Sequence, residues 1–168
     1  MQKNDVSLLF AARILRLFAY GILGVVLVLY LTGLGLTESQ TGLLLTLTLL
    51  GDTTVSLLLT TRADHFGRRR TLIGGAALLT VAGIVFALTK NFTVLVIAGT
   101  IGIISPSGNE VGPFLPIEQA ALSQVVSSAS RTKVFAWYVL AGSFVTAGGS
   151  LFGGVATSFL ESNAAITG

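Results

Sequence analysis

Long apolar runs separated by short polar segments dominate the chain. Most of these runs have clear ends. The run that starts at Phe92 stays apolar to Ile104 and then meets a Ser/Pro/Gly-rich stretch, so its end is ambiguous by several residues. A membrane-spanning helix needs roughly 20 mostly apolar residues. The pattern therefore predicts an all-α transmembrane protein with about five membrane-spanning helices in a single membrane domain, 1–168. The expected spans are 8–31, 41–61, 71–88, 92–113 and 134–160.

The segment between the fourth and fifth expected spans, 114–133, is too polar to cross a bilayer. Its apolar residues are spaced so that they could share one face of a short helix lying in the interface. We therefore expect 114–133 to be a cytoplasmic or interfacial loop. The residues of that face are Ile117, Ala120, Ala121, Leu122 and Val125.

Basic residues gather in alternate loops, which predicts the orientation of the chain. Lysine and arginine are enriched in short cytoplasmic loops. With the N-terminus in the cytoplasm, only Lys90 falls on the opposite side. We expect an integral multi-pass protein of a cell (inner) membrane, with its N-terminus cytoplasmic. The residues placed on the cytoplasmic side are Lys3, Arg62, Arg68, Arg69, Arg70, Arg131 and Lys133.

Composition supports the membrane class and argues against several kinds of chemistry. Of 168 residues, 52% are hydrophobic and 10% charged, whereas a soluble domain carries about a quarter charged residues. The chain has no cysteine and one histidine, His65, so metal sites and nucleophilic triads lack their parts. We expect no enzyme activity, no metal and no cofactor. The net charge of +3 is explained by the basic loops, so we expect no nucleic-acid partner.

The loop after the second expected span reads Thr60-Thr61-Arg62-Ala63-Asp64-His65-Phe66-Gly67-Arg68-Arg69-Arg70. It places a carboxylate among cations at a helix end, with a glycine that permits a tight turn. This motif resembles the G-x-L-A-D-R-x-G-R-R/K-R/K signature between the second and third helices of major facilitator superfamily transporters. Thr60, Arg62 and His65 depart from it. The residues that match are Asp64, Gly67, Arg68, Arg69 and Arg70.

The resemblance implies a conformational role for these five matching residues. In the superfamily, this aspartate meets the end of a helix in the C-terminal half and stabilises one state of the transport cycle. The superfamily's working unit has two six-helix halves with the substrate site between them. About five helices here imply a partial N-terminal six-helix bundle, truncated before the sixth.

A glycine-rich stretch in the last expected span, Gly149-Ser150-Leu151-Phe152-Gly153-Gly154, is similar to the G-P-x-x-G-G stretch of the superfamily's antiporters. Ser150 stands in place of the proline, so drug export gains no support. Gly149 and Gly153 also form a G-x-x-x-G pair, and close helix packing is the interpretation that we favour.

Several ionisable residues fall inside the expected spans, where they usually face protein or water. Arg13, Arg16 and Tyr20 lie three and four residues apart, on one helix face. At 1.5 Å per residue, Arg16 lies roughly 12 Å and Asp52 roughly 15 Å from the cytoplasmic end of its helix. We hypothesise that Arg13, Arg16, Asp52 and Glu110 converge on a polar cavity that binds solute or relays protons. The alternative is that the arginines snorkel to headgroups and Glu110 is a loop residue.

The predicted function is that of the N-terminal part of a secondary active transporter, which moves a small solute by alternating access. Expected partners are the lipid bilayer, a small-molecule solute, and the missing C-terminal half or another membrane chain. Coupling of the solute to protons is one option. The alternative is a non-transporting truncated remnant or a helix-packing membrane subunit. The sequence leaves the solute, the direction of transport and the coupling ion open.

Overall fold

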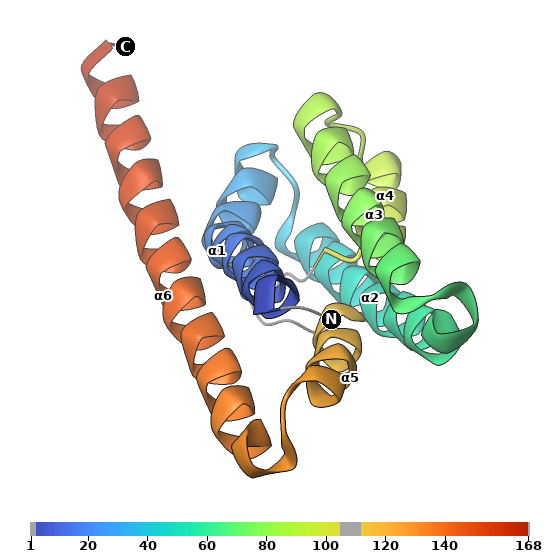
Figure 1. The fold of residues 1–168 in the computed structure, drawn as a ribbon. Coiled ribbons are helices and arrows are strands. Elements are labelled where there is room, and N and C mark those ends of the chain that lie inside the picture. The colour runs from blue at the N-terminus through green and yellow to red at the C-terminus, as the bar shows by residue number, and fades with distance from the viewer. Residues whose placement is uncertain (1–2, 105–111, 168) are drawn as a thin grey trace.

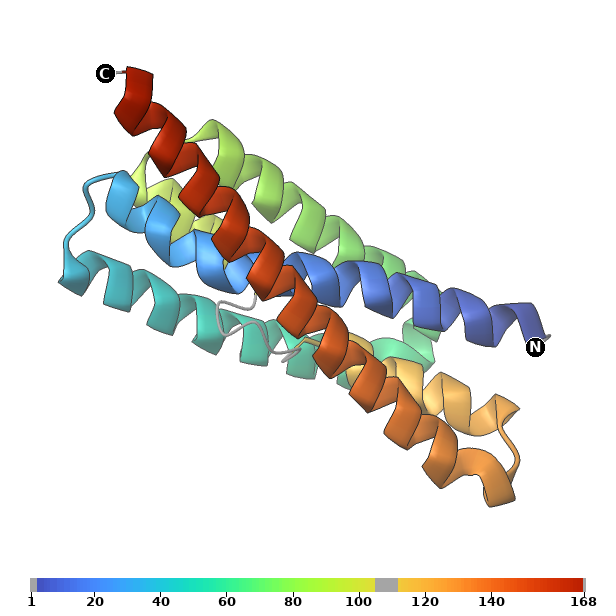
Figure 2. The same ribbon diagram turned by 90° about the vertical axis from the view of Figure 1, so that its left-hand side faces the viewer.

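The protein, in a computed structural model that describes residues 3–104 and 112–167, is a bundle of helices (Figure 1). The first three helices run in alternating directions and are joined by short turns (Figure 2). The helices are α1 (Lys3–Gly33), α2 (Glu38–Phe66), α3 (Arg68–Leu88), α4 (Phe92–Ile101), α5 (Phe114–Val125) and α6 (Ser128–Thr167).

The helix ends follow from local sequence. Thr37 caps α2 in a reciprocal capping box with Gln40, whose side chain accepts from the Thr37 backbone N–H, so two otherwise orphaned donors are satisfied. Gly67 separates α2 from α3 at φ +88°, a conformation that glycine adopts without steric cost. The Asn91 side chain accepts from two backbone N–H groups at the start of α4.

Four helices are long and apolar enough to cross a membrane: Val6–Gly33, Glu38–Phe66, Arg68–Leu88 and Ser128–Phe159. This confirms the prediction of an all-α membrane fold. The expected spans 8–31, 41–61, 71–88 and 134–160 lie within α1, α2, α3 and α6. Where the bilayer surfaces cross these helices stays a prediction. The fourth expected span, 92–113, contains α4, which has 10 residues.

The distribution of side chains is the reverse of that in a soluble protein. Large apolar side chains such as Leu15, Phe144 and Leu151 are more than two-thirds exposed. Glu118 and Asp52 are fully buried. An apolar exterior, with charged groups buried among apolar core residues, suits a bundle whose solvent is hydrocarbon.

Glycines bring α1 and α6 into close contact. A Cβ added at Gly149 would collide with the Phe18 backbone, and one at Gly153 would lie 3.2 Å from Ile22 Cα. Ser150 Oγ donates to the Gly21 carbonyl across the same contact, at 3.0 Å. The glycine stretch of α6 therefore packs helices, as small residues do in membrane bundles.

α5 lies within the segment 114–133, where the sequence allowed a short helix with one apolar face. It lies at the end of the bundle that holds the N-terminus, and α4 lies nearer the opposite end (Figures 1 and 2). α5 contacts α1, α2 and α3, and its apolar face is buried against them. Glu118, one of the polar residues of the segment, has a charged partner there. Whether 114–133 lies in the cytoplasm or in the interface stays a prediction. The buried residues of α5 are Phe114, Ile117, Glu118, Ala121 and Leu122.

Candidate functional site: a buried charge cluster

A buried ion pair joins α1 to α5. Arg16 Nη2 donates to both carboxylate oxygens of Glu118, at 2.9 and 3.0 Å. Arg13 Nη1 lies 3.8 Å from Glu118 Oε2, and the Tyr138 hydroxyl of α6 donates to the same oxygen at 2.7 Å. Arg13, Arg16, Glu118 and Tyr138 are called the charge cluster below. The first helix therefore meets α5 and α6, which lie about 100 residues further along the chain, at one carboxylate.

Aromatic rings surround the two guanidinium groups. The Arg13 guanidinium lies 4.5 Å from the centre of the Tyr138 ring, and that of Arg16 lies 4.1 Å from the centre of the Phe114 ring. Phe10 packs edge-on against Tyr138, with ring centres 4.7 Å apart. Stacking of this kind suits arginine, whose guanidinium is planar and weakly hydrated.

The helical repeat explains why these side chains meet. Arg13, Arg16 and Tyr20 share one face of α1 by their spacing of three and four residues. Tyr20 is buried and its hydroxyl donates to the Ile103 carbonyl at 3.1 Å. On α5, Glu118 sits in the middle of the inward face, beside Ile117. Each charged side chain is thus held on a helix rather than on a loop, which fixes its geometry.

The cluster offers charge and hydrogen-bonding capacity in a site of low dielectric. An ion pair there interacts far more strongly than one in water, and breaking it without a replacement partner is costly. A solute with its own carboxylate or ammonium group can exchange for one member of the pair. Such exchange would let binding rearrange α1, α5 and α6 together.

Asp52 lies in a separate buried place on α2. Its Oδ1 accepts from the Ser56 hydroxyl at 3.1 Å, and its Oδ2 is buried without a hydrogen-bond partner. None of the described arginines or lysines lies within ion-pair distance of this carboxylate.

The turn between α2 and α3 holds the residues of the family motif. Arg68 Nε donates to Asp64 Oδ1 at 3.1 Å, one helical turn apart, and the Asp64 side chain is 80% exposed. Arg69 and Arg70 are exposed beside it. The turn is formed as the sequence predicted, and its conformational role stays a prediction.

The structure brings together only part of the predicted site. Arg13 and Arg16 lie in the charge cluster, and their described acidic partner is Glu118 and not Asp52. The predicted convergence of the arginines with Asp52 is therefore not observed. The depth argument placed Arg16 and Asp52 at similar heights, but equal height does not fix which faces of two helices meet. Glu110 lies outside the described residues.

Sequence reasoning missed Glu118 and Tyr138 as members of the site. A signal was present for Glu118. It is a single acid within an apolar stripe (Phe114, Ile117, Ala121) at helical spacing, and a solvated acid belongs on the opposite face. Tyr138 gave no such signal, because an aromatic residue inside an apolar run is ordinary.

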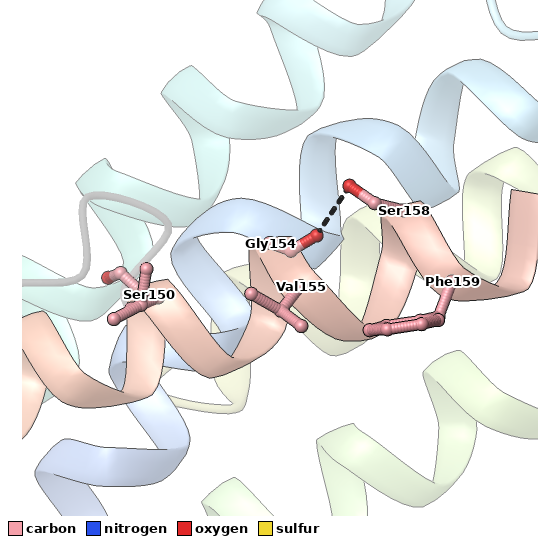
Figure 3. Close-up of a pocket in the computed structure, with 6 residues that line it drawn as sticks. Ser150, Gly154, Val155, Ser158 and Phe159 are labelled. Carbon is pink, nitrogen blue, oxygen red and sulfur yellow. Dashed lines mark hydrogen bonds between the residues drawn. The ribbon is translucent and has the colours of Figure 1, made fainter.

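A hollow of about 590 Å³ lies along α6, away from the cluster. Its described lining residues all come from α6, and Figure 3 shows several of them along one helix. The Ser158 hydroxyl donates to the Gly154 carbonyl of its own helix, at 2.9 Å. None of the described lining residues is charged, so this surface suits helix packing more than chemistry. The lining residues are Ser150, Leu151, Gly154, Val155, Ser158 and Phe159.

Comparison with known proteins decides the family. The model of the Major Facilitator Superfamily matches residues 9–166. The chain belongs to this superfamily. Membership makes it an integral multi-pass membrane protein of a transporter family, which confirms the identification suggested by Asp64, Gly67 and the arginines after them.

Two kinds of relative are similar to this member of the superfamily. The uncharacterized membrane protein YJR124C of Saccharomyces cerevisiae is 40% identical over 158 residues, which is 94% of this chain and 35% of the relative. The quinolone resistance protein NorA of Staphylococcus aureus is 32% identical over 112 residues, 67% of this chain and 28% of NorA. No solved structure matches the chain significantly. The chain thus spans about a third of the length of these relatives.

Proposed function

We propose that the chain is the N-terminal part of a secondary active transporter that moves a small solute by alternating access. In this proposal the charge cluster forms the polar part of the solute pathway. The observation that carries it is the burial of Arg13 and Glu118, with the Arg16 side chain only 9% exposed beside them, inside a bundle whose exterior is apolar. Ionisable residues inside membrane proteins are expensive and usually mark substrate or ion pathways.

The geometry supports a solute with a charged or strongly hydrogen-bonding group. Arg16 Nη2 donates to both oxygens of Glu118, and Arg13 Nη1 forms a longer ion pair of 3.8 Å with the same carboxylate. A guanidinium recognises a carboxylate through paired donors, so a carboxylate on the solute suits exchange at the arginines. Quinolones carry a carboxylate, and the relation to NorA makes a quinolone the first solute to test.

The Asp64 turn completes the proposal. Asp64 is exposed apart from its contact with Arg68, as expected for a group that meets a partner helix in one state of the cycle. We place this turn and the N-terminus on the cytoplasmic side of a cell (inner) membrane, where short basic loops remain.

The test is transport by the full-length gene product reconstituted in lipid vesicles. Its DNA is read downstream of codon 168 for the remaining helices. A fluorescent quinolone and a radiolabelled small carboxylate are the probes, and Arg16→Ala is compared with Lys133→Ala, an exposed cation on α6. We expect saturable transport of a probe that Arg16→Ala abolishes and Lys133→Ala leaves intact. Equal rates in both variants would contradict a pathway through the cluster.

A second candidate is a helix-packing subunit that does not transport. The exposed apolar side of α6, with the hollow beside it (Figure 3), supports docking of another helix, either from a longer chain or from another membrane chain. Defined oligomers of the 168-residue chain in lipid nanodiscs, together with no further helices encoded downstream, would favour this function over transport.

A further inference from the structure

Asp52 is a buried acid that the charge cluster does not use. Its side chain is fully buried in α2, and only Oδ1 has a hydrogen-bond donor, the Ser56 hydroxyl. Oδ2 is buried with no partner. A buried carboxylate needs a cation, several donors or a proton to offset the loss of water.

Thr48 repeats this feature one helical turn earlier. Thr46, Thr53 and Thr54 of α2 satisfy their hydroxyls on the carbonyl four residues back, whereas that of Thr41, at the start of the helix, is buried without a partner. Thr48 Oγ1 is fully buried and has no partner. A Cβ added at Gly99 of α4 would lie 2.5 Å from it. The hydroxyl therefore faces the α4 backbone, on the side of α2 that also buries Asp52.

The elements packed around Asp52 supply no described counter-charge. α4 contains no titratable residue. α1 carries Arg13, Arg16 and Tyr20, and α5 carries Glu118, all engaged in the contacts given above. On α3 the charged residues are the arginines at its start, 68–70, beside the exposed turn. The remaining charged residues of α2 stand at its two ends.

We propose that Asp52 is a proton-binding site, in which Oδ2 takes a proton from water and releases it to water, while Oδ1 keeps the bond from Ser56. Thr48 Oγ1 is the neighbouring group that can hydrogen-bond to a water molecule carrying that proton. A hard metal cation fits less well, since it takes about six oxygen ligands. The buried side-chain oxygens within one helical turn of Asp52 on α2 belong to Asp52, Ser56 and Thr48, which is too few for such an ion. A role for Asp52 as the coupling site of the transport cycle rests on the proposed function. The binding of a proton by Asp52 does not depend on it.

The α2–α4 contact controls access to this site. A Cβ at Gly51, the residue before Asp52, would collide with the Thr100 backbone of α4. The helices therefore meet at glycine, and water reaches Asp52 only when α2 and α4 separate. Proton exchange is in this way linked to a movement of helices.

The experiment is infrared spectroscopy of the 168-residue chain in lipid nanodiscs, which needs no transport. A protonated carboxyl gives a carbonyl band distinct from that of a carboxylate, and the band shifts when its proton is replaced by deuterium. We expect a protonated band near neutral pH that Asp52→Asn removes and Asp64→Asn leaves. Ser56→Ala should move the band, since it removes the bond to Oδ1. This second variant assigns the band without a change of charge.

Helix separation is tested by the rate of deuterium exchange at the same band. Gly51→Ala should speed exchange by about tenfold or more, because overpacking the contact favours the separated state. Gly42→Ala, on the same helix with open space around it, should leave the rate unchanged. A band that survives Asp52→Asn, or one that responds to sodium and not to pH, would overturn the proposal. If the band is assigned to Asp52 but the full-length protein transports no solute, the proposed function fails and the proton site stands.

Discussion

Replacing Glu118 with glutamine tests whether the charge cluster is an ion pair. Glutamine keeps the size of the side chain and can still accept the Tyr138 bond of 2.7 Å. It removes the negative charge that Arg16 contacts at 2.9 and 3.0 Å. The variant therefore isolates charge from shape.

The size of the stability loss in Glu118→Gln distinguishes a charged Glu118 from a neutral one. Removing one partner of a buried ion pair costs about 3–5 kcal/mol. Neutral hydrogen bonds between membrane helices average about 0.6 kcal/mol and reach about 1.7 kcal/mol. Because the side chains of Arg16 and Glu118 are 9% and 2% exposed, little solvent screening applies. We expect Glu118→Gln to lower the free energy of unfolding by about 3 kcal/mol or more.

The assay is reversible unfolding of the chain in lipid or mixed micelles, with Arg16→Gln and the double variant completing a double-mutant cycle. The coupling energy should reach about 2–3 kcal/mol, near the upper limit for contacting residues. Asp64→Asn is the control, since this acid is 80% exposed and exposed pairs contribute about 0–1 kcal/mol. A loss of unfolding free energy below about 1.7 kcal/mol for Glu118→Gln, together with no coupling energy between the two substitutions, would refute a charged pair.

Three further predictions concern single contacts, each measured by the same unfolding assay. Tyr138→Phe removes the donor to Glu118 and should cost about 1.5–3 kcal/mol, the range for bonds to charged groups; no loss would mean that this bond does not form. Gly149→Ala should cost about 1–3 kcal/mol by overpacking against Phe18, whereas Gly148→Ala, with open space around it, should be neutral. Asp64→Asn should change stability by less than about 1 kcal/mol yet slow transport by the full-length protein, and an unchanged rate would contradict a role in the cycle.

Sequence predicted the long helices well because each depends on local information. Apolar runs of spanning length, the turn at Gly67 and the spacing of Arg13 and Arg16 are all properties of neighbouring residues. Close packing by Gly149 was also visible in its pattern. In each case the physical cause lies within one or two helical turns.

The partners in the site could not be predicted in the same way. Whether Arg16 meets Asp52 or Glu118 depends on how α1 rotates against α2 and α5, which packing over the whole bundle decides. The segment 114–133 was predicted to be too polar to cross a bilayer, and its sequence does not show that Arg16 offsets the charge of Glu118. The burial of α5 is thus a tertiary effect, and so is the position of Tyr138.

A solute pathway through the charge cluster can be tested directly by thiol labelling, because the chain contains no cysteine and one introduced cysteine reports alone. Ala121→Cys lies one helical turn from Glu118 on the buried face of α5, and Leu151→Cys, on the apolar exterior, is the unreactive control. In the full-length protein, the account predicts that a membrane-impermeant thiol reagent labels Ala121→Cys from each side of the membrane and that the transported solute slows both reactions. Labelling from neither side, or labelling that no transported solute slows, would contradict it.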